Sequence, residues 1–194
     1  MGAVAGLGRR SLLAIAVTIA GCAAASAPHS GEEWRAHVDA GRVAYEDGDR
    51  PTAEREFRAA LDVASVEKPP GLATAVALNA LAVLYINDGR LSDAAPMLNE
   101  ATRIFEERGA TNDQSFALLL TNRAQLAFAQ HRLVDAESES RRALAIAAVP
   151  KTVHDRAVVA LVASLCAQGR VDEAQHVGAE LSIGCSKAGR EPGP

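Results

Sequence analysis

A repeated pattern constrains this chain more than any other feature of its sequence. Four segments align, each consisting of an apolar-periodic run, a tight turn and a second run: "VAYEDGDRPTAEREFRAAL", "AVLYINDGRLSDAAPMLNEAT", "LAFAQHRLVDAESESRRAL" and "VASLCAQGRVDEAQHVGAEL". Their turns fall at Gly48, Gly89, His131 and Gly169, spaced by 41, 42 and 38 residues. Periods of roughly 20–50 residues are typical of stacked repeats, in which each unit buries its apolar face against its neighbours.

Small side chains recur at fixed distances from these turns. Alanine lies five residues after each turn, at Ala53, Ala94, Ala136 and Ala174, and the positions seven further on are Ala60, Ala101, Ala143 and Leu181. Small residues there let the second helix of a unit approach the first, and the second helices have N-cap candidates at Thr52, Ser92, Asp135 and Asp172. The pattern predicts eight antiparallel helices at about 33–46, 51–66, 72–88, 92–108, 114–130, 134–148, 152–168 and 171–183.

The repeats resemble the tetratricopeptide repeat (TPR), a helix-turn-helix unit. Matches to its motif are Ala53, Phe57 and Ala60 in the first unit and Tyr85, Gly89, Ala94 and Ala101 in the second. The long spacing, "LNALAVLY" and "AAPMLNEAT" resemble the kinesin-light-chain variant. The third unit departs from the motif with Arg123 and Ala127 where bulky apolar residues are expected, and the fourth has Gly178 inside its second helix. The resemblance implies an all-α TPR solenoid of about four repeats, at about 34–67, 75–108, 117–150 and 155–184 within a domain at 33–184.

The N-terminal segment has the layout of a secretory signal. Two arginines in "MGAVAGLGRR" precede the short uncharged run "SLLAIAVTIA", which lacks the length of a membrane-spanning helix. The following "IAGC" resembles the lipobox of bacterial lipoproteins, which implies a cleaved signal peptide at 1–21 and a lipid on Cys22. A plain secretory signal or an uncleaved anchor is the alternative. We expect a lipidated flexible tether at 22–32 and a disordered tail at 185–194.

The residue after Cys22 bears on the location of the protein, and the net charge bears on its partners. Ala23, rather than aspartate, favours the periplasmic face of the bacterial outer membrane over inner-membrane retention, by the sorting rule of the resembled family. Without residues 1–21, 18 basic and 24 acidic residues leave a net charge of −6. Nucleic-acid binding requires a basic face, so the sequence predicts no nucleic-acid partner.

The sequence offers no recognisable catalytic or metal-binding motif. The five histidines lack the spacing of metal ligands. His131 is predicted to be a surface turn residue. The pairs Glu32–Glu33 and Glu106–Glu107 are predicted to lie on solvated helix faces rather than to act as acid–base pairs. We therefore predict no enzyme activity and no cofactor. Cys166 is expected near the turn end of its helix, and Cys185 lies thirteen residues past Asp172, about 20 Å up the partner helix. We therefore expect no disulfide unless the tail unwinds and folds back.

The first helices of a TPR stack line a concave groove, and residues at i, i+4 and i+7 face it. This places Val38, Arg42 and Tyr45, then Asn79, Val83 and Ile86, then Thr121, Gln125 and Phe128, and finally Val159, Ala163 and Cys166 on the groove. Asn79 and Asn122 each match one asparagine of the L-N-N-L-A motif, which in the resembled family implies a hydrogen bond to a peptide backbone. We expect Asn79 to be solvated and available for such a bond. Ordinary solvated helix positions are the alternative for each of these residues.

The sequence therefore predicts a membrane-anchored periplasmic scaffold or adaptor that binds another envelope protein or peptide in its groove. The candidate groove residues are Arg42, Tyr45, Asn79, Val83, Ile86, Asn122, Gln125 and Phe128, and the candidate lipidation site is Cys22. A self-associating structural lipoprotein without a distinct client is the alternative.

Overall fold

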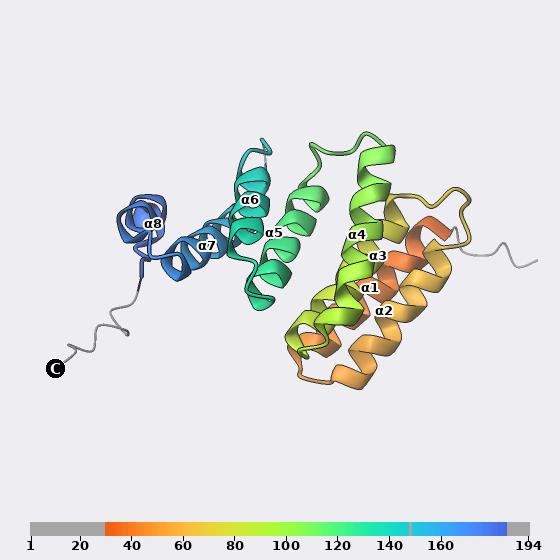
Figure 1. Cartoon of the computed structure of the whole chain (residues 1–194). Helices are drawn as coiled ribbons and strands as arrows, with labels where there is room; N and C mark the ends of the chain where they lie inside the picture. The colour runs from red at the N-terminus through yellow and green to blue at the C-terminus, as the bar shows by residue number, and fades with distance from the viewer. Residues whose placement is uncertain (1–29, 148, 186–194) are drawn as a thin grey trace, which may run out of the picture.

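The structure, a computed structural model, describes residues 30–147 and 149–185, and every regular element there is a helix (Figure 1). The helices are α1 (Ser30–Glu46), α2 (Arg50–Ala64), α3 (Leu72–Asn87), α4 (Leu91–Glu107), α5 (Gln114–Ala129), α6 (Leu133–Leu144), α7 (Lys151–Ala167), α8 (Val171–Gly178) and the short 3₁₀ helix η1 (Ala179–Leu181). The predicted all-α fold is confirmed for this part of the chain. The predicted lipobox and Cys22 lie outside the described residues.

Consecutive helices pair into four hairpins, α1 with α2, α3 with α4, α5 with α6 and α7 with α8. The second helix of each of the first three hairpins also packs on the first helix of the next hairpin, and α1, α3, α5 and α7 contact one another in succession. Figure 1 shows the hairpins stacked in a row from α1 to α8. This arrangement is the predicted helical-hairpin solenoid.

A left-handed residue ends the first helix of every hairpin. Gly48, Gly89 and Gly169 have φ angles of 81°, 75° and 77°, and His131 adopts φ 59° at the equivalent place. The next residue then donates its backbone N–H to a carbonyl five residues earlier, as Arg90 does to Tyr85 (2.8 Å) and Arg132 does to Ala127 (2.9 Å). These bonds satisfy carbonyl groups that have no partner within the helix, so each turn is a Schellman cap. Glycine is preferred at its left-handed position because it has no Cβ.

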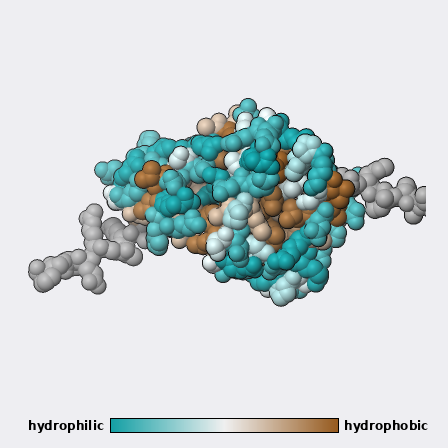
Figure 2. All heavy atoms as spheres, turned by 45° about the vertical axis from the view of Figure 1, so that its right-hand side comes forward, coloured by the Kyte–Doolittle hydropathy of each residue, from teal (hydrophilic) through white to brown (hydrophobic). Residues whose placement is uncertain are grey.

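The alanines after the turns are buried, as the repeat pattern predicts. Ala53, Ala94 and Ala174 are 0 % exposed and Ala136 is 1 % exposed. Larger side chains pack around them. Between α4 and α5, the ring centroids of Phe105 and Phe116 are 5.4 Å apart. Polar side chains cover most of the face in Figure 2, where the hydrophobic ones show mainly in the furrows between them. The small alanine side chains therefore let the helices of each hairpin pack closely, and the core forms around these contacts.

Two details of the predicted helices are wrong. Thr52, Ser92, Asp135 and Asp172 are not N-caps, because the left-handed turn residue lets each second helix begin directly afterwards, with Asp49, Arg90, Arg132 and Arg170 at the caps. Asp49 Oδ1 accepts the N–H of Thr52 at 3.1 Å, whereas each arginine pairs with an acid three residues later, such as Arg90 with Asp93. The helices expected to run to 148 and 183 end at Leu144 and Gly178.

None of the helices in the described part of the chain combines the length and the hydrophobicity of a membrane span.

Candidate functional site

The first helices of the last two hairpins line a hollow on the solenoid. A volume of about 410 Å³ lies over Thr121, Gln125 and Phe128 of α5 and over Asp155, Arg156, Val159, Ala160 and Ala163 of α7. A second hollow of about 550 Å³ shares Phe128, Val159 and Ala163 and extends to Cys166, Ile183 and Cys185. We call the two hollows together the α5–α7 groove. Phe128 and Val159 are 39 % and 50 % exposed there, so the groove presents large apolar side chains to solvent.

Helical spacing explains why these residues meet. Thr121, Gln125 and Phe128 follow one another at intervals of four and three residues, as do Val159, Ala163 and Cys166, which places each set on one stripe of its helix. All six predicted residues line the α5–α7 groove. Thr121 is nevertheless 4 % exposed, because its hydroxyl donates to the carbonyl of Ala117 at 2.9 Å.

The same stripe in the first two hairpins carries polar links between helices. Asn87 Nδ2 donates to the hydroxyl of Tyr45 at 2.8 Å, and Asn87 Oδ1 accepts from Gln125 Nε2 at 3.2 Å. Arg42 is exposed and pairs with Glu46 of its own helix at 3.0 Å. Asn87 therefore joins three successive first helices. Sequence reasoning missed it because the residue lies one position beyond the predicted stripe.

The remaining predicted residues of α3 are less accessible than expected. Ile86 is 7 % exposed, so it belongs largely to the core, and Val83 is half-buried.

The prediction that Asn79 is solvated is wrong. Asn79 and Asn122 are 7 % and 1 % exposed, and Asn122 Nδ2 donates to Asn79 Oδ1 at 2.9 Å between α3 and α5. Arg156 of α7 donates to Asn122 Oδ1 at 3.0 Å. The two amides face the contact between neighbouring first helices, where the Asn79 oxygen accepts from Asn122 and the Asn122 oxygen accepts from Arg156. They therefore link adjacent repeats, and their burial leaves little of either amide accessible to a peptide.

The expectation of no disulfide is also wrong. Cys166 and Cys185 are bonded, with Cα atoms 5.3 Å apart. The chain leaves the helix at Gly178 and turns at Ser182, whose φ is 54°, so that it folds back towards α7. Ile183 N–H donates to the Gly178 carbonyl at 3.1 Å, and a Cβ on Gly178 would collide with the carbonyl oxygen of Ile183. The glycine inside the fourth repeat is thus the residue that allows the return.

The described residues contain no group of three or more His, Cys, Asp and Glu that could hold a metal ion. His37 Nδ1 lies 2.9 Å from Glu56 Oε2, and this hydrogen bond, followed by that from Arg55, lowers the pKa of the Glu56 carboxyl. The pairs Glu32–Glu33 and Glu106–Glu107 are exposed, and so is His131.

The comparison with protein-family models agrees with this geometry. Residues 35–107, which include most of α1 and all of α2, α3 and α4, match the family model of the tetratricopeptide repeat. Residues 35–107 are tetratricopeptide repeats. The later two hairpins continue the same turn and alanine pattern, so the described part of the chain forms one solenoid of helical hairpins. TPR solenoids are typically protein-interaction scaffolds rather than enzymes.

Among solved structures, the chain is similar to BtubC (BKLC) from P. vanneervenii, at 18% sequence identity and a TM-score of 0.48. This similarity covers 87% of this chain and 96% of that chain. None of the curated proteins matches the chain significantly.

Proposed function

We propose that this TPR protein is an adaptor of the bacterial cell envelope, anchored by a lipid on Cys22 to the periplasmic face of the outer membrane. Its client is a segment of another envelope protein, bound as an extended peptide or a helix in the α5–α7 groove. The observation that carries this proposal is the exposure of Phe128 and Val159 beside an otherwise small-residue floor. A groove with apolar contacts and a few polar groups at its margin suits peptide side chains.

The polar margin supports a peptide client. Gln125, Asp155 and Arg156 border the apolar part of the groove and supply hydrogen-bond donors and acceptors. Peptide binding needs such groups, because backbone N–H and C=O groups that lose water require partners. Asp155 is held ionised, since the hydrogen bond from Lys151 lowers the pKa of its carboxyl despite partial burial.

One feature of the sequence and one of the structure support the envelope location. "IAGC" follows a short hydrophobic run and ends in the cysteine that bacterial lipoproteins acylate. The Cys166–Cys185 disulfide suits an oxidising compartment such as the periplasm.

The groove is tested by photo-crosslinking in the native cell. A photoreactive residue replaces Val159 in one strain and Val134 of α6 in another; Val134 is 71 % exposed and lies outside the groove. We expect a specific envelope protein to be crosslinked from position 159 and not from position 134. In a pull-down with that purified client, Val159→Glu lowers affinity by at least about ten-fold, whereas Val134→Glu leaves it unchanged.

Equal crosslinking from both positions, or equal affinity of the two glutamate variants, would remove the α5–α7 groove as the client site. Light scattering over a concentration series separates the adaptor from a self-associating structural protein. A client-binding monomer keeps a constant mass, while growth of the mass with concentration would favour self-association.

The anchor has its own test. Replacing Cys22 with serine removes the thiol that carries the lipid, so we expect the variant to leave the membrane fraction or to stay unprocessed. Fractionation and mass spectrometry of the mature N-terminus measure this. Cys166→Ser is the matched control because it removes a different cysteine, and it keeps the protein on the membrane. Unchanged fractionation and processing of Cys22→Ser would rule out the lipoprotein assignment.

A further inference from the structure

The residue four positions before each turn faces the second helix of the preceding hairpin. In the second, third and fourth hairpins it is Tyr85, Ala127 and Leu165. Tyr85, Ala127 and Leu165 are all buried, at 2 %, 2 % and 0 % exposed. Ala127, which departs from the repeat pattern, has the smaller side chain, and a hollow lies beside it.

Tyr85 shows what this space accommodates. Its hydroxyl donates to Glu54 Oε1 at 2.9 Å and accepts from Arg58 Nη2 at 3.0 Å, both from α2. The guanidinium of Arg90 lies over the ring, with Cζ 3.8 Å from the ring centroid. Burial opposes ionisation of Glu54, but the Tyr85 hydrogen bond and the charges of Arg58 and Arg90 lower the pKa of its carboxyl. The Tyr85 hydroxyl therefore both donates and accepts a hydrogen bond, and a cation lies over the face of its ring.

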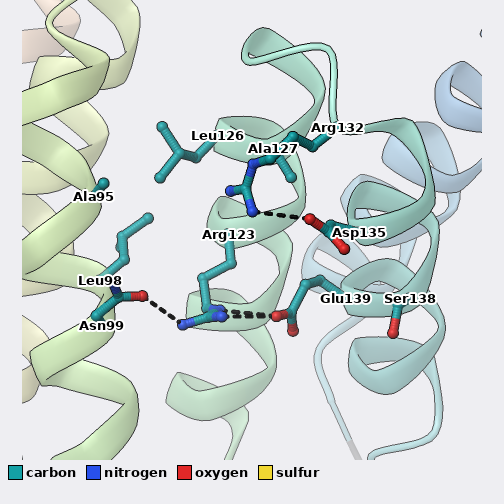
Figure 3. A pocket seen from close by; sticks show the side chains of 10 residues that line it. All are labelled: Ala95, Leu98, Asn99, Arg123, Leu126, Ala127, Arg132, Asp135, Ser138 and Glu139. Carbon is teal, nitrogen blue, oxygen red and sulfur yellow. Dashed lines mark hydrogen bonds and ion pairs between the residues drawn. The ribbon is translucent and has the colours of Figure 1, made fainter.

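The interface between the second and third hairpins has an arginine at the position of Arg90 but no tyrosine at the position of Tyr85. Arg132 takes the place of Arg90, Ala127 that of Tyr85, Ala95 that of Glu54 and Asn99 that of Arg58. A hollow of about 290 Å³ lies there between α4, α5 and α6 (Figure 3). We call it the α4–α6 pocket. It shares no lining residue with the α5–α7 groove.

The walls of the α4–α6 pocket are polar on one side and apolar on the other. Ala95, Leu98, Leu126 and Ala127 supply apolar surface, as Figure 3 shows. Leu98 and Leu126 are 1 % and 4 % exposed, so packing holds these walls in place.

The charges on the rim are already paired. Arg132 Nη1 binds Asp135 at 2.8 Å, while Arg123 binds Glu139 at 2.9 Å and Asn99 Oδ1 at 3.2 Å. Two guanidinium groups facing two carboxylates leave no net charge to attract an anion or a cation. Asn99 has the position in its repeat that Arg58 has beside Tyr85, and its amide nitrogen is also a hydrogen-bond donor.

We propose that the α4–α6 pocket binds a tyrosine side chain presented by a partner protein. The ring lies beneath Arg132 as the Tyr85 ring lies beneath Arg90, and the hydroxyl points to Asn99. A free amino acid is not the ligand, because its ammonium and carboxylate would need charged partners and the rim charges are occupied. This site is a second contact on the adaptor, on the side of its second helices.

The test uses the full chain and a capped tripeptide, N-acetyl-Ala-Tyr-Ala-amide. We expect millimolar binding on the order of a single anchoring side chain, detected as NMR shifts at Ala95, Asn99 and Ala127. The matched tripeptide with leucine in place of tyrosine binds at least about ten-fold more weakly. Free tyrosine, as the other source of the phenol, also binds at least about ten-fold more weakly.

Filling the pocket supplies the second arm of the test. Ala127→Tyr reproduces the residue of the preceding interface, so we expect a folded protein in which the tyrosine tripeptide no longer shifts these signals. Ala127→Leu, which reproduces the leucine found at position 165, serves the same purpose if the larger residue prevents folding. Val159→Glu in the α5–α7 groove leaves tripeptide binding unchanged, which separates this proposal from the proposed function.

Three results would overturn the proposal. They are equal binding of the tyrosine and leucine tripeptides, equal binding of free tyrosine, or shifts that persist in the filled variant that folds.

Discussion

Replacing Ala94 with leucine lowers the free energy of unfolding by about 1–3 kcal/mol, and urea denaturation followed by circular dichroism measures the loss. Ala94 is 0 % exposed and lies in α4 where that helix approaches α3. It belongs to the same buried cluster as Leu81, Tyr85 and Leu98. Three additional carbon atoms have no space there, so neighbouring side chains must leave their preferred rotamers or the helices must separate.

Ser92→Leu is the matched control for Ala94→Leu. Ser92 is exposed in the first turn of the same helix, so the same side chain added there changes stability by less than about 0.5 kcal/mol. Equal unfolding midpoints for the two variants would mean that this face of α4 is not packed against α3, and the repeat register would then be wrong.

Reduction of the Cys166–Cys185 disulfide lowers the stability of the last hairpin by about 3 kcal/mol, the amount expected for a closed loop of this size. The two cysteines are 19 residues apart, and the bond joins α7 to the segment that returns after α8. The packing here is slight, because α8 has only 8 residues and its core cluster comprises Val158, Leu161, Val162, Leu165 and Ala174. A covalent link therefore contributes a large share of the stability of this end of the solenoid.

Hydrogen exchange with and without a reductant measures this effect locally. With the reductant, backbone amides of α8 exchange faster, by the factor that corresponds to the lost stability. The exchange rates of amides in α3 and α4 do not change, because repeats in a solenoid contact only their neighbours. In the double variant Cys166→Ser, Cys185→Ser, the reductant has no effect. Exchange in α8 that does not respond to the reductant in the unmodified protein would contradict the prediction.

The sequence predicted the parts of the fold that depend on residues close together in the chain. The turns at Gly48, Gly89, His131 and Gly169 each require a left-handed residue, and the alanines five positions later each face a helix of the same hairpin. Because both signals are local and recur, they located the hairpins, and the stripes that line the α5–α7 groove followed from helical spacing.

The helix ends were less predictable for a local reason as well. The last helix was expected to reach 183, but the chain leaves it at Gly178 and turns back at Ser182. A glycine in a helical pattern is compatible with both a continuing helix and a stop, and only the contact between Ile183 and Gly178 distinguishes them. The disulfide depends on this return, so the expectation about the cysteines was wrong together with the helix end.

The sequence by itself determined the helical hairpins, their number in the described chain and the faces that must be buried. The tertiary structure decided what lies between hairpins. Asn79 is hydrogen-bonded to Asn122 across two first helices, and Ala127 lines one hollow with Ala95 and Asn99 of the preceding hairpin. These partners are separated by 43, 32 and 28 residues, and each residue alone is an ordinary helix position. Whether an amide is solvated or satisfied, and whether an alanine packs or leaves a pocket, depends on the side chain opposite, which the stacking of the repeats selects.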